Sequence, residues 1–390
     1  MRLTRLLAAS AAIALIAGPA TAETVKVGFI TTTSGPFASL GLTQDNAVKL
    51  FVAKNGDSSG GHKIEIIRRD EAGPNPDVAK RLAQELITRD GAKIITGLVF
   101  TPNALAVAPL ATESKTPVVI MNAATAMITT RSPYLTRVSL TLPQTTEIFG
   151  RWAATKGGMK QAITSVSDYG PGHDAEAAFK QGFTDAGGTL AGSVRMPLAN
   201  PDFVPFLQRI LDQKPEGVYA FLPGGTQPTA YVKAFNELGL AKAGVKLMPS
   251  AEATNESQID NLGDLAIGLI TATHYSAGYQ SAKNREFVAA YRAAYNTDPD
   301  FFAVGAWDGM QMIYDTVKAL DGKIDGDKAM DFIKTWKSES PRGPISIDPA
   351  TRDIVQNIYI CKVERVNGRL TNVVFETYPA VKDPWKERNK

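Results

Sequence analysis

Short hydroxyl-rich or glycine-rich segments follow most of the buried, strand-like runs of this sequence. The most informative one is Thr101-Pro102-Asn103, which comes directly before an apolar helical run. Threonine is a good N-cap and proline suits the first helical position, so the free N–H groups beyond Thr101 would face outward at a positive helix end. This arrangement suits a carboxylate, although helix capping alone would select the same residues.

Two further side chains in such segments could contact a ligand. Tyr169 lies in a Tyr-Gly-Pro-Gly turn, where its ring and hydroxyl could cover a ligand or simply lie on the surface of the turn. Glu252 follows a predicted strand and could pair with an ammonium group, although most single glutamates are solvated. Ligands of open parallel sheets bind beyond the carboxyl ends of the strands, so these segments are expected to meet at one site.

No pattern typical of an enzyme is present in the sequence. The three histidines are His62, His173 and His274, and their spacing matches no metal site. There is no G-x-S-x-G, H-E-x-x-H, Walker or G-x-G-x-x-G motif. We therefore expect a binding protein with no catalytic residue, no metal and no cofactor. Turnover of a bound ester or amide would instead identify a hydrolase.

The first 22 residues have the pattern of a cleaved secretory signal peptide. Arg2 and Arg5 begin it, and the uncharged apolar run at 6–17 is too short to cross a bilayer. Residues 20–22, Ala-Thr-Ala, then provide the small side chains that signal peptidase requires. The mature, exported chain is expected to begin at Glu23.

Composition excludes several other classes of protein. The chain has 42 Lys and Arg against 39 Asp and Glu, and this near balance argues against a nucleic-acid partner. Cys361 is the single cysteine and lies far from the cleavage site, so neither a lipid anchor nor an internal disulfide is expected. A chain of 390 residues is long enough to divide into two domains, each with its own core.

Strand-like and helix-like runs alternate in two successive series. The first series predicts strands at 25–30, 64–67, 94–97 and 117–121, and helices at 44–55, 76–90 and 102–112. The second predicts strands at 162–166, 190–196, 217–221, 245–248 and 265–273, and helices at 173–186, 203–213 and 226–238. Helices at 283–296, 303–320 and 328–337 and a hairpin at 356–366 and 370–377 complete the chain. The alternation predicts an α/β protein with two doubly wound parallel-sheet lobes.

Five motifs stand in a specific order along the chain: Val27-Gly-Phe-Ile with Ser34-Gly-Pro, Gly97 to Thr101, Asn122-Ala-Ala-Thr125, Asp168-Tyr-Gly, and Phe302 to Asp308. Together they resemble the leucine/isoleucine/valine-binding protein family, the type I periplasmic solute-binding proteins of ABC importers. The resemblance covers essentially the whole mature chain. It implies two lobes, 23–142 plus 275–350 and 143–274 plus 351–390, joined by a hinge of three segments near 141–144, 272–276 and 348–352.

The same resemblance assigns roles to residues of the expected site. Thr101 takes the position of the carboxylate-binding Ser or Thr of the family. Ala123 would offer a backbone carbonyl to the ligand amine, and Thr125 would offer its hydroxyl and its backbone N–H. Tyr169 would close on the ligand from the second lobe.

Three more positions carry over, and one departs from the family. Glu252 resembles the acidic residue that neutralises the ligand amine, when the alignment is moved by one residue. Leu40 and Phe302 match positions that line the side-chain pocket. The aromatic residue that the family has near 223–224 is replaced by Pro223-Gly224-Gly225, which would enlarge or reshape the cavity. Phe37, Phe100 and Phe221 could line such a pocket.

The resemblance implies a periplasmic, monomeric binding protein that captures a branched-chain amino acid by closure of two lobes and delivers it to an inner-membrane ABC permease. The reshaped cavity leaves open an aromatic or other small carboxylate as the ligand of the same transport role. A ligand-sensing module that docks on a separate receptor is a remoter alternative.

Overall fold

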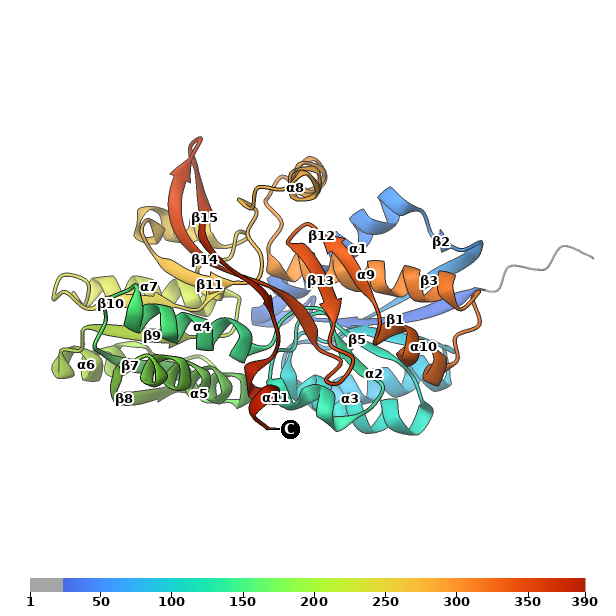
Figure 1. Cartoon of the computed structure of the whole chain (residues 1–390), viewed down its shortest axis with the longest axis horizontal. Helices are drawn as coiled ribbons and strands as arrows, with labels where there is room; N and C mark the ends of the chain where they lie inside the picture. The colour runs from blue at the N-terminus through green and yellow to red at the C-terminus, as the bar shows by residue number, and fades with distance from the viewer. Residues whose placement is uncertain (1–23, 390) are drawn as a thin grey trace, which may run out of the picture.

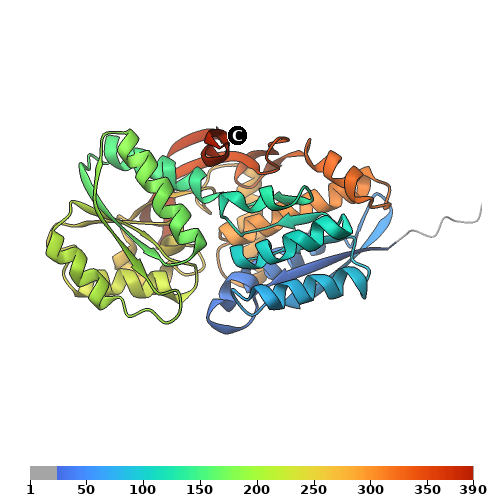
Figure 2. The same cartoon turned by 90° about the horizontal axis from the view of Figure 1, so that it is seen from below.

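The computed structural model describes residues 24–389, and the predicted signal peptide at 1–22 lies outside this range. Two lobes lie side by side (Figures 1 and 2). The first lobe contains the blue and cyan N-terminal segments and the orange helices, and the second contains the green and yellow segments. Within residues 24–389 no helix combines the length and the apolar character that crossing a membrane requires.

The first lobe is built on a six-stranded sheet with the strand order β2-β3-β1-β4-β5-β6. Its strands are β1 (Val25–Thr31), β2 (Ser58–Ser59), β3 (His62–Asp70), β4 (Ile94–Gly97), β5 (Val118–Ile120) and β6 (Leu135–Arg137). All neighbours are parallel except the short edge strand β2. The helices of this lobe are α1 (Ala38–Asn55), α2 (Pro76–Thr88), α3 (Thr101–Ser114), α8 (Ala282–Tyr295), α9 (Phe301–Ala319) and α10 (Gly326–Ile333).

The second lobe repeats this plan with a four-stranded parallel sheet in the order β10-β9-β7-β8. Its strands are β7 (Gln161–Ser167), β8 (Thr189–Met196), β9 (Gly217–Phe221) and β10 (Lys246–Pro249). Its helices are α4 (Leu142–Thr155), α5 (Gly170–Asp185), α6 (Val204–Gln213) and α7 (Thr226–Glu237). The predicted fold class, two doubly wound α/β lobes, is confirmed.

The central strand β9 shows why a fully buried run forms this sheet. Tyr219 and Phe221 pack into one core with α4 and α5, whereas Val218 and Ala220 pack into a second core with α6 and α7. Successive side chains of a strand point to opposite faces, so a sheet covered by helices on both faces requires apolar residues at every position.

Antiparallel strands join the C-terminal part of the chain to both lobes. They are β11 (Ile270–Thr273), β12 (Lys337–Ser340), β13 (Gly343–Ile347), β14 (Ile354–Val366) and β15 (Arg369–Val381). One end of β14 pairs with β13, and its remainder pairs with β11 and β15. The predicted hairpin turn at Asn367-Gly368 is present with φ of 50° and 82°, and Cys361 is buried within β14.

Several element boundaries differ from those predicted, for example the start of α1 at Ala38 instead of residue 44, and in two segments the secondary structure changes within the predicted element. The strand expected at 265–273 begins only at Ile270, because residues 259–266 form the 3₁₀ helix η4 (Ile259–Ala266). The helix expected at 328–337 ends at Ile333, and β12 begins at Lys337. In both segments a continuous apolar pattern crosses a change of secondary structure, which periodicity alone does not locate.

The buried side chains group by lobe. One core contains residues from 25–138 and 275–354, and the other cores contain residues from 142–272 and 358–370. The single-residue boundaries of the lobes stay a prediction. The C-terminal helix α11 (Pro384–Arg388) lies where the two lobes meet: Lys386 contacts Thr129 and Asp353, while Arg388 contacts Glu147 of α4, with Nη1 to Oε1 at 2.9 Å.

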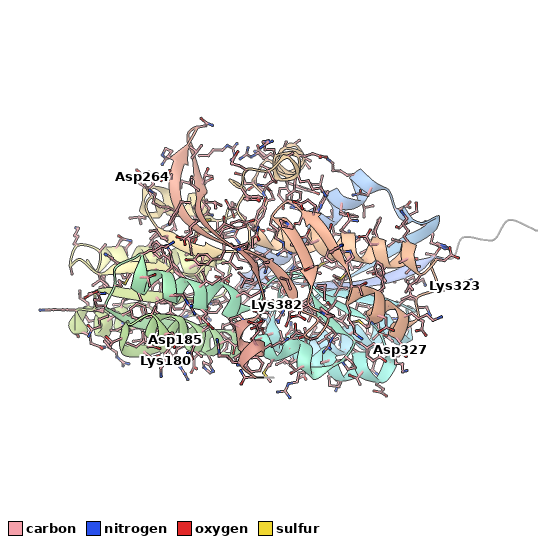
Figure 3. All side chains as sticks on the ribbon, in the orientation of Figure 1. Lys180, Asp185, Asp264, Lys323, Asp327 and Lys382 are labelled. Carbon is pink, nitrogen blue, oxygen red and sulfur yellow. The ribbon has the colours of Figure 1, made fainter. Side chains whose placement is uncertain are left out.

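Charged side chains of both signs cover the outside of both lobes. Lys180, Asp264 and Lys323 are examples that point outward in Figure 3. Charges of both signs, nearly balanced in the sequence, are therefore spread over the surface.

Candidate functional site

A cavity between the two lobes encloses about 450 Å³ of empty space, including its opening to solvent. Its walls are formed by Leu40, Val99, Phe100, Thr101, Asn122, Ala124, Leu140, Leu142, Tyr169, Pro171, Phe221, Pro223, Gly224, Glu252 and Phe302. Five of the seven residues predicted for the site are among them: Leu40, Thr101, Tyr169, Glu252 and Phe302. We call this space the ligand cavity.

Three helices from the two lobes begin at the ligand cavity. They are α3, α5 and α7, and their N-cap residues are Phe100, Tyr169 and Gly225. None of these N-caps accepts a hydrogen bond from its helix through a side chain. The first backbone N–H groups of the three helices are therefore free of a side-chain cap, and each helix adds the positive end of its dipole. Such an arrangement favours an anionic ligand group.

Thr101 and Thr125 contact each other beside the start of α3. The Thr101 hydroxyl lies 3.0 Å from Thr125 Oγ1, and the Thr125 N–H lies 3.4 Å from Thr101 Oγ1. Both side chains are buried. A Cβ atom built on Gly170, the first residue of α5, would lie 4.0 Å from Thr125 Oγ1. The two predicted threonines are thus brought together opposite the start of a second-lobe helix, and Thr125 itself does not line the ligand cavity.

The carbonyl of Ala123 already accepts a hydrogen bond from the protein. Arg137 Nη1 donates to this oxygen at 3.0 Å and to the carbonyl of Thr125 at 2.8 Å. The same guanidinium donates from Nε and Nη2 to Asp353 Oδ1, at 2.9 Å and 2.7 Å. Ala123 is buried and does not line the ligand cavity, so its contact with a ligand amine stays a prediction.

Arg137 is a residue that the sequence did not single out. It is completely buried at the end of β6, beneath the backbone that carries Ala123 and Thr125. The only signal in the sequence is a charged residue within a run of otherwise uncharged residues, which is not specific. The charge of Arg137 is balanced by Asp353, so its contribution here is to hold the two backbone carbonyls in place.

The loop before Thr101 is held by two polar side chains. Glu71 Oε1 accepts the N–H of Val99 at 3.0 Å and the hydroxyl of Thr32 at 3.2 Å. Asn122 Nδ2 donates to the carbonyl of Val99 at 2.8 Å. Burial raises the pKa of Glu71 to about 7, and its hydrogen bonds oppose this shift. These contacts fix the backbone that places Thr101 at the first turn of α3.

Glu252 is a carboxylate without a cationic partner at the site. It belongs to the 3₁₀ helix η3 (Ala251–Thr254), and within residues 24–389 it forms no ion pair with Lys, Arg or His. Burial raises its pKa above the ordinary value, and a hydrogen bond with Ser250 opposes the shift. Such a carboxyl can pair with an ammonium group or exchange a hydrogen bond with a hydroxyl.

Aromatic rings form much of the cavity wall. Phe221 stacks on Tyr169 with the ring centroids 6.4 Å apart and an interplanar angle of 25°. Phe100 and Phe302 line the wall from the first lobe. Phe37 contacts Phe100 edge to face at 5.1 Å and supports it from outside the lining. Flat rings of this kind offer a large contact area to a planar ligand.

The glycines at 224 and 225 reshape the cavity by letting the lobes approach. A Cβ atom built on Gly224 would lie 2.6 Å from Leu40 Cδ2 and 3.2 Å from Phe302 Cζ. A Cβ atom on Gly225 would lie 3.2 Å from the carbonyl of Pro36. The space beside these glycines is therefore filled from the first lobe by Leu40 and Phe302. The contacts describe a closed arrangement of the lobes.

Comparison with known proteins identifies a family that matches most of the chain. The family described as periplasmic binding protein matches residues 24–369. The Leu/Ile/Val-binding protein homolog 6 of Brucella melitensis biotype 1 is 42% identical over 381 residues, which are 97% of either chain.

Solved structures of relatives superpose closely on the chain. A solute-binding protein of an ABC transporter from Rhodopseudomonas palustris BisB5, in complex with 3,4-dihydroxybenzoic acid, is 50% identical with a TM-score of 0.90, over 93% of this chain and 99% of that one. A solute-binding protein from R. palustris, in complex with 4-hydroxybenzoate, is 43% identical with a TM-score of 0.91, over 94% of this chain and 100% of that one. Matched along nearly its whole described length, the chain belongs to the periplasmic binding protein family.

Proposed function

We propose that the protein is the solute-binding component of an ABC importer and that its ligand is a small aromatic carboxylate. The observation that carries the proposal is the cavity between the lobes, where uncapped helix N-termini from both lobes meet aromatic side chains. The helix ends suit the carboxylate, and the rings of Phe100, Phe221 and Phe302 suit a planar hydrocarbon. The bound hydroxybenzoates of the two R. palustris relatives support the same ligand class.

A branched-chain amino acid is the second candidate. It is favoured by Glu252, which lacks a cationic partner, and by the name of the Brucella relative. An amine at the carbonyl of Ala123 would lie close to the Arg137 guanidinium, which donates to this oxygen at 3.0 Å. The carbonyl therefore has only one lone pair left for an ammonium group, which disfavours the amino acid at this position.

Capture would proceed by closure of the lobes. The carboxylate first contacts Thr101 and the start of α3 in the open form, and closure then adds Tyr169 and the start of α5. A ligand favours the closed state only through contacts that improve on closure, and the second-lobe groups supply them. The closed protein, a monomer in the periplasm and not an enzyme, then presents both lobes to an inner-membrane permease.

A ligand panel separates the two candidates. We expect benzoate, 4-hydroxybenzoate and 3,4-dihydroxybenzoate to raise the melting temperature, because a ligand that binds only the folded state stabilises it. A ligand at about 100 times its Kd adds about 2.7 kcal/mol to the free energy of unfolding. Leucine, isoleucine and valine are expected to give no shift. Thermal denaturation measures the shift in melting temperature with each ligand, and calorimetric titration then measures its affinity. Binding of leucine but of no aromatic acid would replace our proposal with the amino-acid candidate.

Removing the Thr101 hydroxyl should weaken binding of 4-hydroxybenzoate by about 1–3 kcal/mol, since a buried carboxylate oxygen would lose its donor. Isothermal titration of Thr101→Ala gives the value. Thr88→Ala is the matched control, because Thr88 is an exposed threonine of the same lobe at the end of α2. Wild-type affinity in Thr101→Ala would remove Thr101 from the site.

If the ligand is an amino acid, Glu252→Gln should bind branched-chain amino acids more weakly than the wild type, because the amide lacks the negative charge that pairs with an ammonium group. Equal affinity would exclude Glu252 as the ammonium partner.

A further inference from the structure

A second cavity adjoins the ligand cavity on the side of Glu252. It encloses about 360 Å³ of empty space, including its opening, and we call it the inner cavity. Leu140, Leu142 and Glu252 line both spaces, so the two meet along these three side chains. The polar residues of its remaining wall are Thr145, Thr146, Tyr219, Ser250, Thr273 and His274.

His274 faces this space with an unsatisfied ring nitrogen. The side chain is 1% exposed, and Nε2 is buried without a hydrogen-bond partner among the described residues. Burial and the positive charge of Arg342 hold the pKa of His274 well below its ordinary value, so the ring is neutral near pH 7. A neutral imidazole can donate from one nitrogen and accept at the other. An unpaired buried polar atom is unfavourable unless something binds to it.

Tyr219 presents a hydroxyl to the same wall. It lies 3.3 Å from Thr146 Oγ1, and burial raises the pKa of Tyr219 so that it keeps its proton. The ring stacks on Phe179 at 4.4 Å with an interplanar angle of 8°, and the His274 ring lies 5.6 Å from that of Phe301. Packed rings on a strand and beside the hinge hold these polar atoms in place, as a selective subsite requires.

We propose that the inner cavity binds a neutral hydrogen-bonding substituent, a phenolic hydroxyl, at the end of the ligand opposite its carboxylate, and that Tyr219 and His274 determine specificity for it. The proposal rests on the aromatic-carboxylate function above. A hydroxyl can donate to Glu252 or to the imidazole and accept from the tyrosine. Among the residues that line the inner cavity, Glu252 is the only charged partner for an ammonium group, and the other polar groups are neutral hydroxyls and the neutral His274 imidazole.

Three ligands that differ only at the distal end test this subsite: benzoate, 4-hydroxybenzoate and 4-(aminomethyl)benzoate. Calorimetric titration of the wild-type protein should show 4-hydroxybenzoate binding at least about tenfold more tightly than benzoate, because a site built to bond a hydroxyl is left unpaired without it. The aminomethyl compound should bind more weakly than 4-hydroxybenzoate.

The variants Tyr219→Phe and His274→Leu should each bring the ratio of the two affinities toward one. Thr101→Ala is the control for the other end of the ligand, and it should weaken binding of both acids by the same factor. Thermal denaturation of each variant without ligand verifies folding. Tyr219→Phe retains the stack on Phe179, so it provides a folded test even if His274→Leu is unstable.

An unchanged ratio in both variants overturns the proposal, as does a wild-type protein that prefers the aminomethyl compound. Failure of the proposed function gives a different result, since the wild type would then bind none of the three acids. The proposal is supported if the preference for 4-hydroxybenzoate over benzoate is lost in Tyr219→Phe and His274→Leu and is kept in Thr101→Ala.

Discussion

Replacing Arg137 with methionine should lower the free energy of unfolding of the ligand-free protein by about 3–5 kcal/mol, because it breaks a buried ion pair and leaves the other charge behind. Arg137 is 0% and Asp353 1% exposed in the pair, with Nη2 to Oδ1 at 2.7 Å. Lys386 would remain as an ion-pair partner of Asp353, and the carbonyls of Ala123 and Thr125 would each lose a donor. Urea denaturation monitored by circular dichroism measures the change.

Two matched variants show whether the loss comes from this network. Arg131→Met removes an exposed arginine of the same lobe and should change the free energy of unfolding by no more than about 0.5 kcal/mol. Arg137→Lys keeps the positive charge but loses the planar guanidinium group with its several donors. Its effect on the free energy of unfolding should therefore lie between those of Arg131→Met and Arg137→Met. An Arg137→Met protein as stable as Arg131→Met would show that the network adds nothing to stability.

Replacing Gly224 with tryptophan should weaken ligand binding by about 3 kcal/mol or more, roughly a hundredfold. Leu40 and Phe302 occupy the space beside Gly224, with Leu40 Cδ2 only 2.6 Å from a Cβ built there. The indole would keep the second lobe away from the first, so the ligand would retain only its first-lobe contacts. Titration calorimetry measures the affinity, and small-angle X-ray scattering with ligand should show a larger radius of gyration than for the wild type.

Removing the obstructing side chain provides the control for this variant. The double variant Gly224→Trp with Leu40→Ala should recover part of the affinity, because it frees the space that the indole needs. Residues in contact are expected to show such coupling, whereas distant ones add independently. Wild-type affinity in Gly224→Trp would mean that closure at this contact is not needed for binding.

The fold followed from the sequence because its strands obey a simple pattern. A run such as Gly217 to Phe221 is apolar throughout, and only a sheet covered on both faces buries it. The segment from Lys337 to Ile347 was harder, because its two short antiparallel strands carry alternating polar residues that resemble loop sequence. β13 pairs with β14 as well as with β12, and the backbone contacts between β13 and β14 are not encoded in local periodicity.

The lining of the candidate site could be predicted where a residue follows a strand. Thr101, Tyr169 and Glu252 lie at the carboxyl ends of their sheets, and the topology of a parallel sheet brings such residues to one cavity. Arg137 lacked this signal, since its contacts join segments that are distant in sequence. His274 directly follows β11, but a single histidine there indicated no ligand chemistry because its neighbours in the inner cavity come from distant segments. Arg137 meets Asp353 across 216 residues, a distance that no local motif spans. The contact between Leu40 and Gly224 likewise depends on how the two lobes approach each other, which the sequence pattern does not reveal.

The buried thiol of Cys361 makes this chain a convenient scaffold for a fluorescent biosensor. It is the single cysteine, it lies inside β14, and burial raises its pKa well above the ordinary value. The thiolate is the nucleophile that attacks maleimide dyes, so the native sulfur should remain unlabelled. One cysteine introduced on the exterior of either lobe would then accept a dye selectively, and energy transfer between a pair of them would report lobe closure in real time.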